Sequence, residues 1–289
     1  MRVAVVTDTT ACLSDSRAAE AGVTVVPLHV HVGGTRSVPA REITPGEVVE
    51  ILSTGRERVS TSRPSPGELV ETYRRVTRET GCSAIVSVHL SAGVSGTVEA
   101  AELARDELAH EIAVEVVDSR VVGLAMGYAV LAGARAAAAG GDVQEVADVV
   151  RARSAASRTW FYVDTLEHLR RGGRIGRAAA LVGTALAIKP LLTVRDGEVH
   201  PAAKVRTRAK ALARLVDLAV EVVETARSEG RSVDLAVHQL AAEEAAGELV
   251  GVLRERTGLT AEVAELDPVV GVHTGPGTLG VVVAPGDLR

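Results

Sequence analysis

Aromatic residues are scarce in this chain. Its 289 residues include one Phe, one Trp and three Tyr. Proteins that bind single-stranded nucleic acids stack successive bases on aromatic side chains, and this chain has too few aromatic residues for such a surface. Basic residues are not in excess either, since 32 Lys and Arg stand against 37 Asp and Glu, for a net charge of −5. We therefore expect neither a basic face for phosphate contacts nor a nucleic-acid partner.

Cysteine is equally rare. The two thiols, Cys12 and Cys82, lie far apart, and neither has a Cys or His at the spacing of metal ligands. This pattern predicts no disulfide framework and no metal centre, and two small buried thiols instead.

Long apolar runs are missing as well. The Ala-rich stretch 121–139 is interrupted by glycines and by Arg135, which makes it too weakly apolar to span a bilayer. Residues 1–7 lead directly into a strand pattern and do not have the form of a secretory segment. We therefore expect a soluble cytoplasmic protein without stable membrane insertion.

Short apolar runs alternate with helical patterns in the first half of the chain. Residues 3–6, 83–88 and 114–117 are typical of buried strands, and each run leads into polar residues and then a helical pattern. A further strand signal covers residues 23–32. The alternation predicts an N-terminal α/β domain, residues 1–157, with a mainly parallel sheet and flanking helices.

The second half of the chain begins differently. The run 159–163 holds most of the aromatic residues, and residues 188–194 and 199–205 form a predicted hairpin around an Asp-Gly turn. We predict a C-terminal α/β domain, residues 158–289, with a mixed sheet and helices, and a domain boundary near residue 157. Its remaining predicted elements are helices over 207–229 and 241–257 and strands over 233–238, 261–266 and 279–283.

Several helices have a recognisable start. Thr44 and Ser65 are each followed by Pro-Gly-Glu, an arrangement in which the hydroxyl caps the helix, proline takes its first position and the glutamate caps in return. These signals predict helices over 45–53 and 66–80. Asp164 is the predicted cap of a short helix before a glycine loop.

Two hydroxyl-rich segments stand directly before predicted helices. They are residues 61–67, Thr-Ser-Arg-Pro-Ser-Pro-Gly, and residues 91–97, Ser-Ala-Gly-Val-Ser-Gly-Thr. The start of a helix presents unpaired N–H groups and a partial positive charge, so it holds anions well. Two such segments in one chain predict a site for a small anionic group.

A serine nucleophile is one way to use such a site. Residues 93–97 are close to the Gly-x-Ser-x-Gly nucleophile elbow, but Thr97 stands where the elbow requires glycine. His89 and His273 are possible bases, although no acidic residue is placed with either by a recognisable signature. A serine hydrolase and a small-anion binding protein both stay open at this point.

Other loops give little support to nucleotide or metal chemistry. The glycine loop 172–177 lacks the Gly-x-Gly-x-x-Gly form and follows no predicted strand, and the chain has no Walker loop. Asp8, Asp118 and Asp164 lie at the ends of predicted strands, where a metal would fit but where caps and turns are more common. We therefore expect no bound metal.

Nine short motifs are spread in order over nearly the whole chain. They are residues 8–11, 61–65, 90–97, 117–119, 162–166, 171–176, 188–192, 204–206 and 273–277. Together they resemble the DegV family of fatty-acid-binding proteins, whose members include the fatty-acid-carrying subunit of bacterial fatty acid kinase. The resemblance implies a two-domain α/β protein that holds one long-chain fatty acid in a tunnel between its domains.

The resemblance also implies roles for individual residues. Thr61 and Ser95 correspond to the residues that hold the fatty acid carboxylate in the family. Two positions depart from the family pattern, because Arg63 stands where Gln is common and Val98 where an aromatic residue is usual. The other motif residues that would line or support the head-group site are Ser62, Gly96, Arg174, His273 and Thr274.

A carrier of this kind is not itself an enzyme. The resemblance implies a cytoplasmic protein that binds palmitate, stearate or oleate without a cofactor. It would present the carboxylate to the catalytic subunit of a fatty acid kinase, for acyl-phosphate formation in phospholipid synthesis. A serine hydrolase that acts on a lipid ester and a small-anion binding protein are the alternatives. We expect the basic cluster 204–210 to be a set of solvated charges at a helix start.

Overall fold

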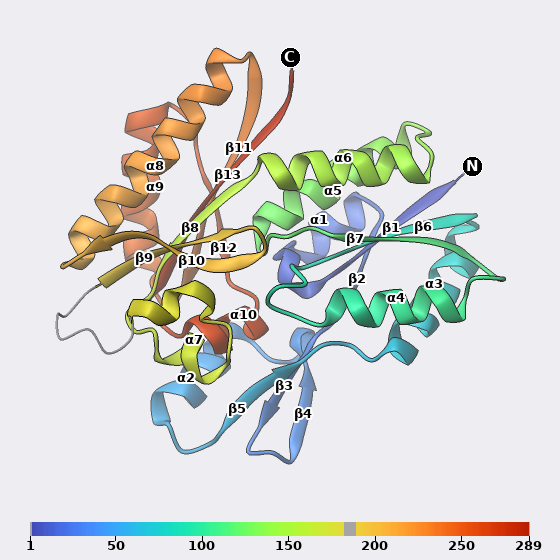
Figure 1. The fold of residues 1–289 in the computed structure, drawn as a ribbon, viewed down its shortest axis with the longest axis horizontal. Helices are drawn as coiled ribbons and strands as arrows, with labels where there is room; N and C mark the ends of the chain where they lie inside the picture. The colour runs from blue at the N-terminus through green and yellow to red at the C-terminus, as the bar shows by residue number, and fades with distance from the viewer. Residues whose placement is uncertain (1, 182–188, 289) are drawn as a thin grey trace.

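A parallel sheet forms the centre of the N-terminal half. The structure is a computed structural model that describes residues 2–181 and 189–288 (Figure 1). The sheet has the strand order β2-β1-β6-β7, and all neighbouring strands are parallel, as the alternation of strands and helices predicts. Its strands are β1 (Val3–Asp8), β2 (Val23–Val26), β6 (Ala84–His89) and β7 (Ala113–Asp118).

A second, antiparallel sheet has the order β4-β3-β5. The strand signal over 23–32 breaks at Pro27, so its two parts belong to different sheets. The sequence pattern does not predict β4, which is short and largely exposed. In β5, Thr61 lies opposite the buried Val30 of β3. The strands are β3 (His29–Val32), β4 (Arg36–Pro39) and β5 (Val59–Ser62).

A six-stranded mixed sheet forms the C-terminal half. Its order is β10-β9-β8-β13-β11-β12, in which only β11 and β12 are parallel among the described pairs. The mixed sheet and the predicted hairpin are confirmed, although residue 188 of the predicted first hairpin strand lies outside the described residues. The strands are β8 (Arg158–Tyr162), β9 (Lys189–Arg195), β10 (Glu198–Val205), β11 (Arg231–Leu240), β12 (Glu262–Glu265) and β13 (Thr278–Leu288).

Helices cover the sheets in layers (Figure 1). α3 and α4 pack on one face of the parallel sheet, α5 and α6 pack on its other face, and α8 and α9 cover the outer face of the mixed sheet. The helices are α1 (Asp15–Glu20), α2 (Pro45–Thr54), α3 (Pro66–Thr80), α4 (Thr97–Glu107), α5 (Leu124–Ala138), α6 (Val143–Ala156), α7 (Glu167–Arg171), α8 (Arg208–Ser228), α9 (Glu243–Thr257) and α10 (Pro268–Thr274).

The two predicted capping boxes are present. The Thr44 hydroxyl accepts a hydrogen bond from the Glu47 N–H at 3.1 Å, and the Glu47 carboxylate accepts one from the Thr44 N–H at 2.7 Å. Ser65 and Glu68 make the same exchange at 3.2 and 2.7 Å. Both helices therefore begin where their local sequence dictates.

Three details differ from the sequence-based expectations. Asp164 does not cap α7, whose N-cap is Leu166, and its carboxylate accepts a hydrogen bond from the Tyr162 hydroxyl at 2.8 Å instead. Helix α10 stands where no element was expected, because its Val-rich sequence has no helical periodicity; Asp267 caps it by accepting from the Val269 N–H at 2.8 Å. Cys12 is partly exposed as a residue, although burial of its thiol raises the pKa of that group far above the usual range, and only Cys82 is buried as a whole residue.

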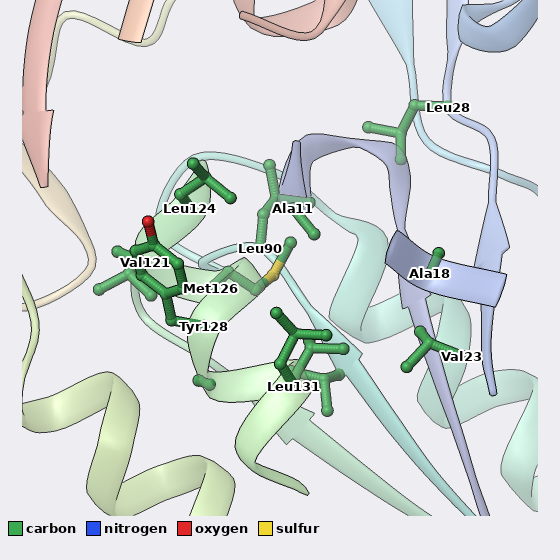
Figure 2. Packing of buried hydrophobic residues seen from close by; sticks show 14 of the residues in the cluster. Ala11, Ala18, Val23, Leu28, Leu90, Val121, Leu124, Met126, Tyr128 and Leu131 are labelled. Carbon is green, nitrogen blue, oxygen red and sulfur yellow. The ribbon is translucent and has the colours of Figure 1, made fainter. Parts of the chain in front are cut away.

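The two halves of the chain share one apolar cluster. Figure 2 shows its part around α5, where Leu124 and Met126 belong to the same cluster as Leu90. The cluster also includes Val272 of α10 and Val282 of β13 from the C-terminal half. The division near residue 157 coincides with the change from one sheet to the other, between α6 and β8. That the two parts are separate domains stays a prediction.

A buried chain of hydrogen bonds runs through the parallel sheet. The Tyr73 hydroxyl donates to Ser87 Oγ at 2.8 Å, Ser87 Oγ lies 2.8 Å from His89 Nε2, and His89 Nδ1 lies 3.0 Å from the Asp8 carboxylate. All four side chains are fully buried. Asp8 also accepts hydrogen bonds from two backbone N–H groups, those of residues 10 and 90. The carboxylate therefore satisfies several buried donors at once.

Replacing Asp8 with alanine should lower the free energy of unfolding by about 3 kcal/mol or more, because the variant leaves several buried donors unpaired. Urea unfolding of the purified variant measures this. The matched control is Asp106→Ala, whose side chain is 65% exposed and pairs with its neighbour Arg105; it should change the free energy by no more than about 0.5 kcal/mol. Equal effects of the two substitutions would contradict the expectation.

Candidate ligand-binding site

A cavity of about 430 Å³ lies between the two halves of the chain. Its volume is within the range of about 300–1,000 Å³ that is usual for small-molecule sites. Most of its lining is apolar and comes from both halves of the chain. Examples are Leu28, Leu90 and Val122 from the N-terminal half and Phe161, Val194 and Val269 from the C-terminal half.

Polar side chains of the lining are linked to one another by direct contacts. Thr61, on β5, lies 2.8 Å from His273 Nε2 through its hydroxyl oxygen. His273 belongs to the last turn of α10 and packs on the backbone of Gly172, where a Cβ atom would lie 2.0 Å from Nδ1. Only glycine fits at position 172 beside this imidazole. The glycine loop therefore borders the same part of the cavity as Thr61.

Arg174 connects the glycine loop to the segment that carries Ser95. Its Nε donates to the Val94 carbonyl at 2.9 Å, and its Nη1 donates to the Gly172 carbonyl at 2.6 Å. These two hydrogen bonds fix the guanidinium between segments that are about eighty residues apart in the sequence. Arg174 itself lines the cavity, so a positive charge lies at the polar part of the lining.

The Ser95 loop is also held by the hairpin of β9 and β10. Ser91 is fully buried, donates through Oγ to the Gly197 carbonyl at 2.7 Å, and accepts through its own carbonyl from the Ser95 N–H at 3.1 Å. Ser95 Oγ lies 2.8 Å from Thr97 Oγ1. Gly96 is the N-cap of α4 and has no side chain to cap it, which leaves N–H groups at the helix start for an anion.

All seven residues that the sequence singles out line this cavity. The Ser62 hydroxyl is 2.8 Å from His31 Nε2, whereas the buried Thr274 hydroxyl has no hydrogen-bond partner among the described residues. The full set is Thr61, Ser62, Ser95, Gly96, Arg174, His273 and Thr274. Their contact with a ligand stays a prediction. Arg63, which is notable in the sequence only as a departure from the family pattern, lines the cavity too.

Burial keeps the imidazole of His273 neutral. Desolvation, with a smaller contribution from the charge of Arg174, lowers the pKa of His273 to about 4. Nδ1 is buried without a hydrogen-bond partner among the described residues. A buried lone pair costs less than a buried N–H without an acceptor, which favours the tautomer with its proton on Nε2. The imidazole then donates to Thr61 and leaves the Thr61 hydroxyl proton for an acceptor in the cavity.

His238 lines the cavity on the mixed sheet and is neutral as well. Its Nε2 accepts from the Leu124 N–H at 2.9 Å, so Nδ1 carries the proton and faces the Ala264 carbonyl at 3.2 Å. Burial lowers the pKa of His238 to about 4. Both nitrogens are satisfied by the backbone, and this histidine joins α5 to the mixed sheet.

The geometry offers no base to a serine nucleophile. Ser95 Oγ is paired with a threonine, and no described hydrogen bond joins it to a histidine. Ser87, His89 and Asp8 have the connectivity of a catalytic triad, but all three are fully buried. A substrate cannot reach that serine.

The described residues include no metal-binding cluster and no membrane-spanning helix. They contain no group of three or more His, Cys, Asp or Glu placed to hold a metal ion. Asp8 and Asp118 accept hydrogen bonds from backbone N–H groups, as turn and cap aspartates do. Within the described ranges, no helix is long and apolar enough to cross a membrane.

The family described as "Uncharacterised protein, DegV family" matches residues 2–286. The chain belongs to the DegV family. A DegV domain-containing protein of Streptomyces coelicolor is 46% identical over 284 residues, which cover 98% of each chain. The resemblance inferred from the nine motifs is thereby confirmed.

Solved structures of the family have the same fold. A DegV family protein from Thermus thermophilus, whose structure is described by its fatty acid binding, is 33% identical with a TM-score of 0.87 and covers 99% of this chain and 100% of its own. DegV of Bacillus subtilis, described as a fatty acid binding protein, is 31% identical with a TM-score of 0.87 over 99% of both chains. The two-part α/β architecture is therefore that of the family.

The lowered pKa of His273 predicts a pH dependence of stability. Between its ordinary pKa of about 6.5 and its folded pKa of about 4, the unfolded chain binds a proton that the folded chain does not. The contribution of His273 to the free energy of unfolding is therefore fully present above pH 6.5. It is lost progressively as the pH falls towards 4. Relative to the wild type, His273→Gln should gain about 2 kcal/mol of unfolding free energy between pH 7 and pH 4.5.

Chemical unfolding at several pH values measures this difference. The control is His110→Gln, which removes an exposed imidazole and should follow the wild type over the same range. A constant difference between wild type and His273→Gln would show that His273 is not a buried neutral group.

Proposed function

We propose that this chain binds one long-chain fatty acid, such as palmitate, stearate or oleate. The observation that carries the proposal is a mainly aliphatic cavity with a connected set of hydroxyls, an arginine and a helix start at one part of its lining. An amphipathic ligand with a long apolar chain and a single anionic head matches this division. The fatty acid binding described for the relatives from Thermus thermophilus and Bacillus subtilis supports it.

The cavity lining should provide most of the affinity. A sixteen-carbon fatty acid has about fourteen methylenes, and at roughly 0.8 kcal/mol each their gross transfer free energy is about 11 kcal/mol. Two or three hydrogen bonds to the carboxylate contribute about 1.5–3 kcal/mol each before desolvation. A small anion would use only the second term and leave the apolar lining unoccupied. The balance favours a fatty acid over phosphate or a similar ion.

The head group is proposed to lie against Thr61 and Ser95. The Thr61 hydroxyl can donate to a carboxylate while it accepts from neutral His273. Ser95 and the N–H groups at the start of α4 provide further donors at the polar part of the lining. The hydroxyls therefore determine the direction in which the fatty acid enters the cavity.

We further propose that the protein is a non-catalytic, cytoplasmic carrier without a cofactor. In this proposal the bound carboxylate is presented to the catalytic subunit of a fatty acid kinase, which forms the acyl phosphate. The resemblance to the family's kinase-associated carriers supports this step. It also explains why Ser95 needs no base, because the phosphoryl transfer belongs to the partner.

Mass spectrometry of the purified protein tests the ligand class. Native spectra should contain one fatty acid for each chain, and Gly280→Leu should reduce that occupancy severely. Gly280 lines the cavity, and a Cβ atom there makes only ordinary contacts, at 3.4 Å or more. The leucine side chain should therefore fit and occupy the part of the cavity proposed for the acyl chain. The matched control is Gly247→Leu on the exposed surface of α9, which should keep full occupancy.

Other outcomes of this experiment separate the alternatives. A serine hydrolase would be labelled at Ser95 by a fluorophosphonate, and a small-anion binding protein would carry neither lipid nor label. If Gly280→Leu fails to fold, Val122→Phe introduces a bulky side chain into the same cavity from the N-terminal half. Full fatty acid occupancy in folded Gly280→Leu and Val122→Phe would contradict the placement of the tail.

Thr61→Ala and Ser95→Ala should each weaken fatty acid binding by only about 1–2 kcal/mol, since the tail provides most of the affinity. Both should strongly impair phosphorylation of the carboxylate by a kinase partner, because the head group loses its orientation. Fatty acid titration and kinase-coupled turnover measure the two effects. The control is Ser60→Ala, which removes an exposed hydroxyl from the same strand. Unchanged turnover in both cavity variants would refute the assignment.

A further inference from the structure

Arg63 extends across the polar rim of the cavity. It follows β5 directly and lines the cavity beside Thr61. Its Nη1 donates to the Glu99 carboxylate on α4 at 2.9 Å. The guanidinium also lies against Gly96, where a Cβ atom would come within 2.1 Å of Nη1. The Arg63 guanidinium can occupy this position because Gly96 has no side chain.

The guanidinium therefore lies over the first turn of α4. Gly96 precedes that turn, Ser95 comes one residue earlier, and Glu99 is the third residue of the helix, within the same first turn. A guanidinium has five N–H donors, and a single carboxylate does not occupy all of them. The remaining donors belong to a side chain that lines the same cavity as Ser95.

The second arginine of the lining is bound differently. Arg174 donates from Nε and Nη1 to the backbone carbonyls of Val94 and Gly172, which fixes it in the loop structure. Arg63 is paired only with a surface carboxylate in the described contacts, and its side chain is 41% exposed beside a Glu99 side chain that is 67% exposed. An exposed ion pair of this kind is weak and exchanges partners easily.

We propose that Arg63 is a head-group specificity residue, and that Glu99 competes with the fatty acid carboxylate for its guanidinium. The inference rests on the proposed function, since it assigns a further contact to the same head group. Glu99 then acts as an internal substitute for the ligand carboxylate. When a fatty acid is bound, Arg63 turns its donors to the ligand and the pairing with Glu99 weakens. A neutral lipid of equal length receives no such contact.

A merely structural ion pair makes a different prediction. If the pair only ties the end of β5 to α4, then removing either partner removes the same contact, and both variants should change binding in the same direction. Competition requires opposite directions. Arg63→Gln removes the cation that the carboxylate needs, whereas Glu99→Gln removes the rival anion and keeps the cation.

Binding of palmitate and of hexadecanol, measured on delipidated full-length protein, tests the inference. Arg63→Gln should weaken palmitate binding about fivefold, and Glu99→Gln should strengthen it about two- to fivefold, as expected for a partly exposed charge contact. Neither variant should change hexadecanol binding more than about twofold. Raising the salt concentration should weaken palmitate binding in the wild type more than in Arg63→Gln. The control Glu111→Gln breaks a comparable pair with Arg74 away from the cavity and should leave both affinities unchanged.

Changes of the same sign in Arg63→Gln and Glu99→Gln would overturn the inference, as would equal effects on palmitate and hexadecanol. Those results would leave fatty acid binding by the wild type intact. A wild-type protein that binds neither lipid would instead overturn the proposed function, and this inference with it.

Discussion

The packing of one apolar cluster across both halves of the chain is the constraint on which the rest of the structure depends. Side chains of α5 and the parallel sheet share it with Val272 of α10 and Val282 of β13. Because these elements are held against each other, β5, the Ser95 loop and the glycine loop meet along one cavity. No single sheet or loop contains the site. Each half contributes part of its lining, and the buried interface fixes their relative positions.

An apolar interface makes strict demands on the polar groups inside it. Buried donors and acceptors must be paired, and buried ionisable groups tend towards their neutral forms. His273 and His238 are both neutral, with pKa values lowered to about 4 by burial, and each bonds to a group of the other half of the chain. Of their ring nitrogens, only Nδ1 of His273 has no hydrogen-bond partner among the described residues. The same residues thus join the two halves and give the lining its few polar points. The contacts that join the two halves are therefore also the polar points of the cavity lining.

Local signals in the sequence predict the local parts of this arrangement. The capping boxes at Thr44 and Ser65 place two helices correctly because their partners lie three residues apart. Helix α10 escapes prediction because it is short and its Val-rich sequence resembles a strand, although Asp267 as cap and Pro268 at the first helical position are a local start signal. Hydroxyl-rich helix starts indicate an anion site, but Thr61 and His273 are 212 residues apart, and only the fold brings them together. Individual ligand roles came from the family resemblance and not from spacing.

The hairpin tip that holds the Ser95 loop has a consequence for cooperativity. Ser91 donates to the Gly197 carbonyl, so the loop that carries Ser95 is held in part by the docked hairpin of the other half. A ligand that contacts the Ser95 loop would therefore be coupled thermodynamically to the docking of the hairpin. By mass action, a high concentration of such a ligand would favour the arrangement in which the hairpin is docked. Undocking of the hairpin would lower the affinity for the ligand by the same coupling free energy. Ligand binding and docking of the hairpin would then be two measures of one equilibrium.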